Sequence, residues 1–185
     1  MSKLAFVHIP KAAGGSVRQW FRRNNFDLVY IKHKPLPCVL DYDYDTSFTV
    51  IRNTYHRLHS LYNFNLSNLP RKLSKKRNRY SPQRVEQIEA ELIAMNKGID
   101  AWIDFYINEL KPWTLGEWCE LIDHVLHMEK LDEDFKQIQT MFNCNDTLLK
   151  ESHVNTDKKI AMTGKFVHTV SKYFHEEINY YGYKP

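Results

Sequence analysis

The residues that suggest chemistry lie near the start of the chain, in the stretch FVHIPKAAGGSVRQWF (6–21). Lys11 stands just ahead of two glycines and a serine, where a helical pattern begins. A strand, a glycine turn and a helix N-terminus can together bind an anion, because backbone N–H groups converge there and the helix dipole and lysine add positive charge. The pattern indicates either a phosphate-type cradle over residues 11–16 or an ordinary strand–turn–helix connection with a solvated lysine.

The elements that must position this cradle alternate between strands and helices. Apolar and β-branched runs predict strands over 4–9, 27–33 and 47–52, and a short fourth one over 125–129. Helical periodicity predicts a helix after Gly15 and further helices over 53–66, 85–110 (broken at Gly98), 114–124, 132–142 and 157–181. This order favours an α/β fold, with a central parallel sheet flanked by helices, in one domain over residues 1–185.

Composition limits the class of protein. The 185 residues carry a net charge of +4, which suggests an anionic ligand. No apolar run reaches the roughly 20 residues of a membrane span, and no signal-peptide core precedes the first strand. The three cysteines have no metal-type spacing and fit a reducing compartment. We therefore expect a soluble, cytoplasmic protein with no membrane partner.

The glycine loop is not a Walker A motif. In that motif the lysine follows the last glycine, whereas Lys11 precedes both glycines, and no GxGxxG motif is present. These differences disfavour an ATPase or a dinucleotide enzyme. A small-molecule or nucleotide kinase with a degenerate phosphate loop is the alternative enzyme.

A strongly basic segment lies in the middle of the chain. Residues 70–84 contain seven Lys/Arg residues, and the pattern predicts a mobile, solvated loop. Such a segment could contact an anionic glycan or cover a nucleotide. It could also make the chain a basic nucleic-acid-binding module that acts by counterion release, which is the alternative to an enzyme.

Two motifs resemble those of sulfotransferases that use 3′-phosphoadenosine 5′-phosphosulfate (PAPS). FVHIPKAAGGS resembles their 5′-phosphosulfate loop, in the version found in the heparan sulfate 2-O and chondroitin carbohydrate sulfotransferases. Ala12 and Gly15 stand where threonines are common, so side-chain hydroxyls are lost but backbone donors are kept. TVIRNTYHRLHSLYNF (49–64) resembles the second family motif, a strand ending in Arg with a Ser eight residues later, although Thr54 replaces the usual proline.

Two further segments resemble the family in the same order along the chain. HVLHMEKLDEDFKQI (124–138) is similar to a strand–Glu–x–Leu–x–x–Asp–Phe segment. SHVNTDKK (152–159) and the later INYYGY (178–183) are similar to the family's His-x-Asn segment and terminal aromatic–Gly–Tyr. The resemblance therefore covers nearly the whole chain.

The resemblance implies the donor, the product and the residues that bind them. PAPS would be the donor and adenosine 3′,5′-bisphosphate the product, with no metal. Arg52 and Ser60 match the residues that hold the 3′-phosphate, and an arginine fork at a strand end suits phosphate. If strands 4–9 and 47–52 are neighbours in a parallel sheet, both phosphate sites open at one carboxyl edge. The expected nucleotide-binding residues are Lys11, Ala12, Ala13, Gly14, Gly15, Ser16, Arg52, Ser60 and Lys158.

A histidine is the expected base for the acceptor proton. His33 follows the second strand and lies between the two phosphate motifs, where the related carbohydrate enzymes place their catalytic histidine. Lys11 would stabilise charge on the donor phosphate, while Glu129 is a rival base by analogy with families that use a carboxylate. His153 and Asn155, with Glu129, are expected on the acceptor side.

The resemblance therefore implies a compact bacterial or viral sulfotransferase that moves a sulfonate from PAPS to an acceptor hydroxyl. From the resemblance, the acceptor is a carbohydrate. A nucleic-acid partner is not expected under this hypothesis.

Overall fold

The computed structural model describes residues 3–39, 42–76, 79–148 and 160–185. Contacts group the chain into two compact units. Unit 1 comprises Met1–Asn53 and Trp113–His153, and unit 2 comprises Thr54–Pro112 and Val154–Pro185. The prediction of a single domain over residues 1–185 stays a prediction.

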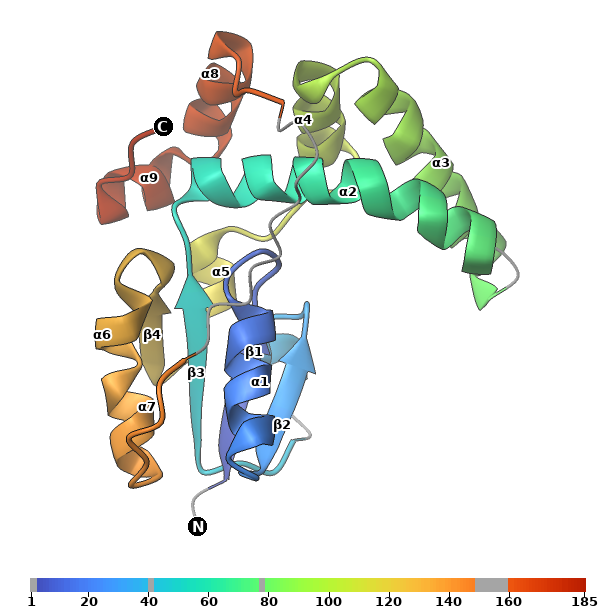
Figure 1. Cartoon of the computed structure of the whole chain (residues 1–185). Coiled ribbons are helices and arrows are strands. Elements are labelled where there is room, and N and C mark those ends of the chain that lie inside the picture. Colours follow the sequence, from blue (N-terminus) through green and yellow to red (C-terminus); the bar gives the residue numbers. More distant parts are fainter. Residues whose placement is uncertain (1–2, 40–41, 77–78, 149–159) are drawn as a thin grey trace. The chain divides into compact units, whose positions relative to one another are not determined.

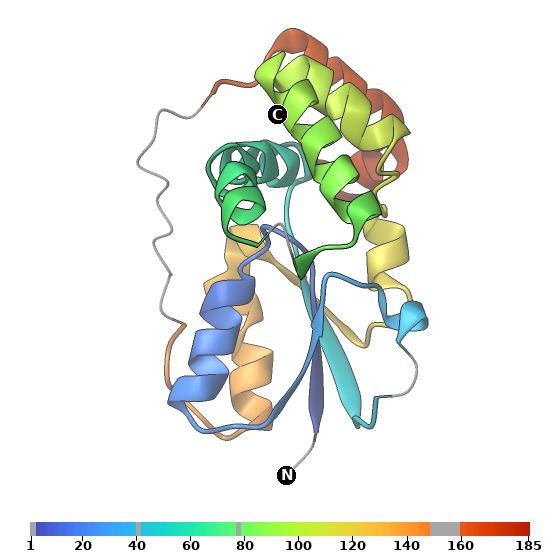
Figure 2. The same cartoon turned by 90° about the vertical axis from the view of Figure 1, so that its right-hand side faces the viewer.

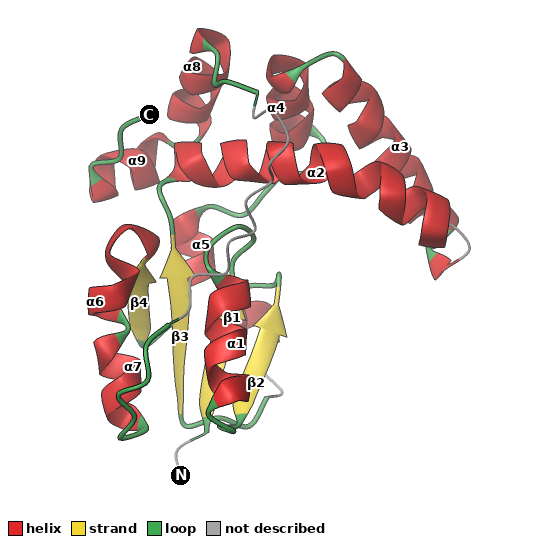
Figure 3. Ribbon diagram, viewed as in Figure 1, coloured by secondary structure: helices red, strands yellow, loops and turns green. Residues whose placement is uncertain are grey.

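Unit 1 contains a parallel sheet whose strands follow the predicted order along the chain. The sheet has four strands in the order β2-β1-β3-β4, and the three neighbouring pairs are parallel (Figure 3). The predicted α/β class is therefore confirmed. The elements are β1 (Leu4–His8), α1 (Gly14–Arg23), β2 (Leu28–Lys32), η1 (Leu36–Cys38), β3 (Thr46–Ile51), α5 (Leu115–Cys119), β4 (His124–His127), η3 (Met128–Lys130), α6 (Leu131–Asp134) and α7 (Lys136–Met141).

The two central strands, β1 and β3, are almost entirely buried because both faces of the sheet are covered. α1, α6 and α7 lie on one face, and η1 and α5 lie on the other (Figures 1 and 2). The register pairs Leu4 with Thr46 and Val7 with Thr49, so both strands end at the same edge. The loop after β1 and the residue after β3 must therefore emerge side by side.

Aromatic packing fixes α1 on the sheet. The rings of Phe6 and Phe48 stack with centroids 4.7 Å apart, and Phe21 of α1 packs on Phe48 with centroids 6.2 Å apart. Trp20 meets Phe135 edge-on at 5.1 Å. Because both helix residues are buried, α1 and the loop that precedes it have a defined position over β1 and β3.

Unit 2 is helical and has its own apolar core. Ser81 caps α3 by accepting a hydrogen bond from the Arg84 amide, and Gly98, with φ of 109°, separates α3 from α4 as predicted. Trp102 and Phe166 are fully buried at the centre of the cluster. The helices are α2 (Thr54–Lys76), α3 (Pro82–Asn96), α4 (Ile99–Asn108), α8 (Gly164–Tyr173) and α9 (His175–Tyr181).

The prediction of a mobile loop over residues 70–84 is wrong. α2 continues through Pro70 to Lys76, and α3 begins at Pro82. Leu69 and Leu73 extend the apolar period of α2 and pack on the core cluster of unit 2, so burial carries the helix past the proline and the charges.

Other predicted helices are shorter than expected or broken. The helix predicted over 114–124 ends at Cys119, because Leu121 takes a left-handed φ of 62° and β4 begins at His124. The helix predicted over 132–142 is two helices, α6 and α7. In the described part of 157–181, α8 and α9 meet at Phe174. Within the described ranges, no helix combines the length and apolarity needed to cross a membrane.

Candidate functional site

The loop between β1 and α1 has the backbone of an anion cradle. Lys11 and Ala13 both adopt left-handed φ values, of 68° and 52°, and the Ala12 amide donates to the Ile9 carbonyl oxygen over 3.3 Å. Turns with alternating backbone handedness direct successive N–H groups toward one point. Ala13 is the N-cap of α1, and among the described residues no side chain caps this helix and no acidic residue lies in its first turn.

The first three residues of α1 are Gly14, Gly15 and Ser16. Because α1 begins at Gly14, Ser16 lies inside the first turn and not at the N-cap position. Gly14 is buried, Gly15 is exposed and Ser16 is half-buried. The backbone N–H groups of this first turn have no acceptor four residues earlier within the helix.

Gly14 is required by a neighbouring side chain. A Cβ atom at position 14 would lie 1.9 Å from Nε2 of His8 and 2.1 Å from its Cδ2. The imidazole of His8, at the end of β1, therefore occupies the space beside the Gly14 backbone. This contact fixes where α1 can begin relative to the strand.

His8 is held as a neutral imidazole. Its Nδ1 is hydrogen-bonded to the hydroxyl of Tyr30 on the adjacent strand β2. Burial, and then the nearby charges of His33, Lys32, Arg18 and Lys11, together lower the pKa of His8 to about 3. Because that value lies well below neutrality, His8 stays uncharged at physiological pH.

Tyr30 and Arg18 extend this packed group. The Arg18 guanidinium lies over the Tyr30 ring, 4.6 Å from its centroid. Burial raises the pKa of Tyr30, and Arg18 opposes that rise. Neither residue was predicted, although the sequence contained a signal: a parallel partner strand places Tyr30 beside Phe6, so its hydroxyl can reach along the face to His8.

His33 lies at the same edge of the sheet as the loop. Its backbone amide donates to the His8 carbonyl oxygen over 3.2 Å, and its φ is 58°. The two imidazole rings have centroids 4.8 Å apart. His33 is exposed and His8 is half-buried, so the imidazole of His8 lies between the predicted base and the start of α1.

Arg52 lies beside the loop, as expected if both follow neighbouring parallel strands. Its Nη1 donates to the Lys11 carbonyl oxygen over 3.2 Å. Burial, and then the charge of Arg52, lower the pKa of Lys11 from its usual 10.5. The site therefore holds two cationic side chains close together and partly away from water, an arrangement that a bound anion would stabilise.

Two acidic side chains order the neighbouring turns. Glu129 accepts a hydrogen bond from the Asn53 amide at 2.7 Å, which fixes the backbone just after Arg52. Asp134 accepts from the His127 amide at 2.7 Å and lies 3.0 Å from His127 Nδ1. Burial would raise the pKa of Asp134, but these hydrogen bonds lower it overall. In this structure Glu129 therefore supports the backbone, and its assignment to the acceptor side stays a prediction.

The remaining predicted site residues lie either in unit 2 or outside the described residues. Ser60 is half-buried on α2, in unit 2. His153, Asn155 and Lys158 lie outside the described residues. Among the described residues no three His, Cys, Asp or Glu side chains gather as a metal site, and the metal-free reaction stays a prediction.

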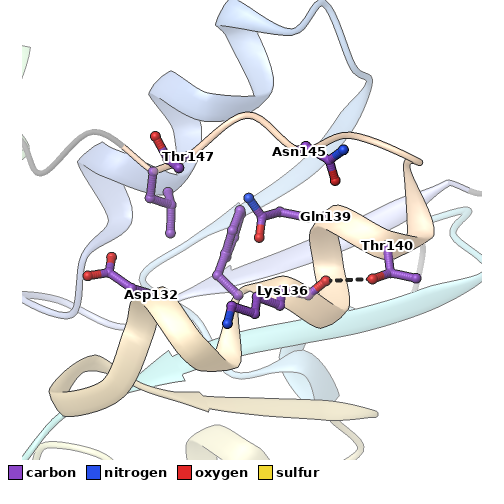
Figure 4. A pocket seen from close by; sticks show the side chains of 8 residues that line it. Asp132, Lys136, Gln139, Thr140, Asn145 and Thr147 are labelled. Atoms are coloured by element: carbon purple, nitrogen blue, oxygen red, sulfur yellow. Dashed lines mark hydrogen bonds between the residues drawn. The ribbon is translucent and has the colours of Figure 1, made fainter.

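A separate pocket of about 870 Å³ lies along α6 and α7 (Figure 4). Asp132, Lys136 and Gln139 line it, and Thr140 donates to the Lys136 carbonyl oxygen within its wall. Its described lining contains none of the predicted site residues. The candidate site is therefore the edge formed by residues 8–16, His33 and Arg52.

Comparisons with models of known protein families, with curated proteins and with solved structures found no match. The geometry of the edge is therefore the evidence on which a function is proposed.

The contact of His8 with Gly14 gives a first prediction. Gly14→Ala is expected to lower the free energy of unfolding by about 1–3 kcal/mol, because the added methyl group overlaps the imidazole. In a chain that already contains His8→Ala the ring is absent, so adding Gly14→Ala should lower the free energy of unfolding by much less. Urea denaturation of the four chains in this double-mutant cycle measures the coupling.

Gly164→Ala is the matched control, since a Cβ there meets open space in the first turn of α8. Equal losses from Gly14→Ala with and without the His8 ring would contradict the contact.

Proposed function

We propose that the chain is a PAPS-dependent sulfotransferase. The observation that carries the proposal is the meeting of the Lys11 loop with Arg52 at the carboxyl ends of two neighbouring parallel strands. Ligands of open parallel sheets bind outside this edge. A donor with phosphate groups at two positions on one nucleoside needs cations from more than one strand, and this edge supplies them.

The chemistry needs mainly positioning and charge stabilisation. The acceptor hydroxyl oxygen forms a bond to sulfur, while the bond from sulfur to the 5′-phosphate oxygen breaks and leaves adenosine 3′,5′-bisphosphate. Lys11 and the first turn of α1 stabilise charge on that departing phosphate. His33 takes the proton of the acceptor hydroxyl. A carbohydrate acceptor is proposed from the sequence resemblance.

Calorimetry with three nucleotides tests the proposal. We expect adenosine 3′,5′-bisphosphate to bind at least about tenfold more tightly than 5′-AMP or ATP without metal, because among the three it alone has a 3′-phosphate, whose contact with Arg52 is worth more than ~1.4 kcal/mol. Arg52→Ala should remove the discrimination between the bisphosphate and AMP. Arg52→Lys is the control that keeps the charge and loses the planar fork.

Equal affinity for the bisphosphate and AMP in the unaltered chain would refute the proposal. Tight binding of ATP only with Mg²⁺ would favour a kinase instead.

The lowered pKa of Lys11 predicts a pH dependence. A bound anion favours the charged lysine, so its pKa rises on binding and a proton is taken up between the two values. Affinity for the bisphosphate should be highest below the pKa of the free protein, and should fall as the pH rises toward and past 10.5. Calorimetry in buffers of different ionisation enthalpy measures the proton uptake.

Lys11→Arg provides the control for that measurement. A guanidinium stays protonated over this range, so the variant should bind with no proton uptake from position 11. Unchanged proton uptake in this variant would show that another group titrates.

His33 is predicted to serve turnover and not binding. His33→Ala should leave bisphosphate affinity within about twofold of the original, because the side chain is exposed and its backbone amide keeps the bond to His8. Turnover with PAPS should fall by roughly 10²–10⁴, the usual contribution of a general base. Sulfonate transfer to a carbohydrate acceptor measures it, and full activity in the variant would assign the base elsewhere.

A further inference from the structure

The proton on the His8 ring has two possible positions, and the neighbours of the ring select between them. A neutral imidazole carries one proton, on either Nδ1 or Nε2, and its other nitrogen is an acceptor. Because the low pKa of His8 keeps the ring neutral, one of its nitrogens donates a hydrogen bond and the other accepts one. The contact between Nδ1 of His8 and the Tyr30 hydroxyl therefore determines what Nε2 does.

The chemistry of this pair makes Tyr30 the hydrogen-bond donor. A phenol O–H is more acidic than the N–H of a neutral imidazole, and an imidazole nitrogen is a better acceptor than a phenol oxygen. Burial raises the pKa of Tyr30, so its hydroxyl keeps the proton at neutral pH. The Arg18 guanidinium lies 4.6 Å from the centroid of the Tyr30 ring, and a nearby positive charge strengthens the O–H as a donor. Nδ1 therefore accepts, and Nε2 carries the proton.

Nε2 is also the ring atom that lies closest to the start of α1. A Cβ atom at Gly14 would lie 1.9 Å from Nε2, 2.1 Å from Cδ2 and 2.4 Å from Cε1 of His8. Gly14 is the first residue of α1, and the first backbone N–H groups of a helix have no acceptor four residues earlier within it. The Nε2–H group therefore lies beside the N–H groups that a bound anion would contact.

A neutral donor suits the charges around this ring. Four titratable side chains act on it: His33, Lys32, Arg18 and Lys11. Another positive charge would add to their repulsion when no anion is bound. An N–H group instead adds a hydrogen bond to an anion and no charge.

We propose that Tyr30 is a positioning residue that holds His8 as its Nε2–H tautomer, and that this N–H donates to a sulfonate or phosphate oxygen bound at the first turn of α1. The inference rests on the proposed function, because it adds a hydrogen-bond donor to the same nucleotide loop. Lys11 and Arg52 act there through charge, whereas His8 acts as a neutral donor. Tyr30 acts through His8 and does not itself contact the ligand.

Nuclear magnetic resonance measures the position of the proton directly. In the full-length chain with ¹⁵N-labelled histidine, two-bond correlations distinguish the protonated ring nitrogen from the unprotonated one. The chain has nine histidines, so the signals of His8 are assigned by their loss in His8→Gln. We expect a protonated Nε2 at neutral pH, and a shift of its resonance on addition of sodium sulfate but not of sodium chloride at the same ionic strength. A proton on Nδ1, or an Nε2 resonance that sulfate leaves unmoved, would overturn the proposal.

Tyr30→Phe tests the positioning role. Without the hydroxyl, both tautomers of His8 should be populated, and sulfate should bind roughly twofold to fivefold more weakly because the ring is no longer held. Tyr55→Phe is the matched control, since it removes a hydroxyl that lies 2.7 Å from Ser171 Oγ in unit 2. This control should change neither the tautomer nor the sulfate affinity. An unchanged tautomer with unchanged sulfate affinity in Tyr30→Phe would show that Tyr30 does not position the ring.

Two substitutions of His8 separate hydrogen bonding from packing. His8→Gln keeps an N–H donor on a side chain of similar reach, and His8→Met keeps the size without a donor. Sulfate affinity should stay within about threefold of the original in His8→Gln and fall by about tenfold or more in His8→Met. Equal weakening in both would show that the ring only packs against Gly14, which would overturn the proposal.

The nucleotide experiment fails independently of this one. If adenosine 3′,5′-bisphosphate does not discriminate from AMP while sulfate shifts the Nε2 resonance, the transfer reaction is refuted and the His8 donor stands. If the bisphosphate binds as proposed while the proton is on Nδ1, the transfer reaction stands and this inference is refuted.

Discussion

The parallel pairing of β1 with β3 is the constraint on which the candidate site depends. It places the Lys11 loop and Arg52 at one edge, close enough for Arg52 to donate to the Lys11 carbonyl oxygen. The same pairing forces two cations into a partly buried region, which lowers the pKa of Lys11. Such an arrangement weakens the folded state without an anion and favours binding of one, so fold and proposed function share a physical cause.

His8, at the end of β1, contacts both the start of α1 and the neighbouring strand β2. Its ring fills the space beside Gly14, its Nδ1 bonds to Tyr30, and its carbonyl oxygen accepts from the His33 amide. One neutral side chain thus touches the start of α1, the neighbouring strand and the residue proposed as base. Its low pKa matters structurally, because a charged imidazole there would add to the repulsion already present among the cations of the edge.

The sequence predicted the parts that depend on local pattern and strand order. An apolar run predicted β1, and alternating and β-branched residues predicted β3; parallel pairing of these strands with β2 then brings Lys11, His33 and Arg52 to one edge. The packing of the His8 ring between Gly14 and Tyr30 was not predicted. It depends on the register between β1 and β2 and on the absence of a Cβ atom at position 14. The helix predicted over 53–66 ends too early, whereas α2 continues to Lys76. The density of basic residues favoured a loop there, but the helical spacing of Leu69 and Leu73 indicates a continued helix. α1 begins at Gly14 and not after Gly15, because a helix N-terminus cannot be fixed to one residue from a glycine pair.

The basic residues of the chain lie in two environments that salt screens differently. Lys11 and Arg52 are partly buried, so mobile ions screen them weakly and a ligand must fit their geometry. Arg71, Lys75 and Arg84 are exposed, so salt screens them strongly. The net charge of the chain is therefore a poor guide to the surroundings of Lys11 and Arg52, since residues 70–84 contain seven of the 26 Lys/Arg residues and none of the 22 Asp/Glu residues.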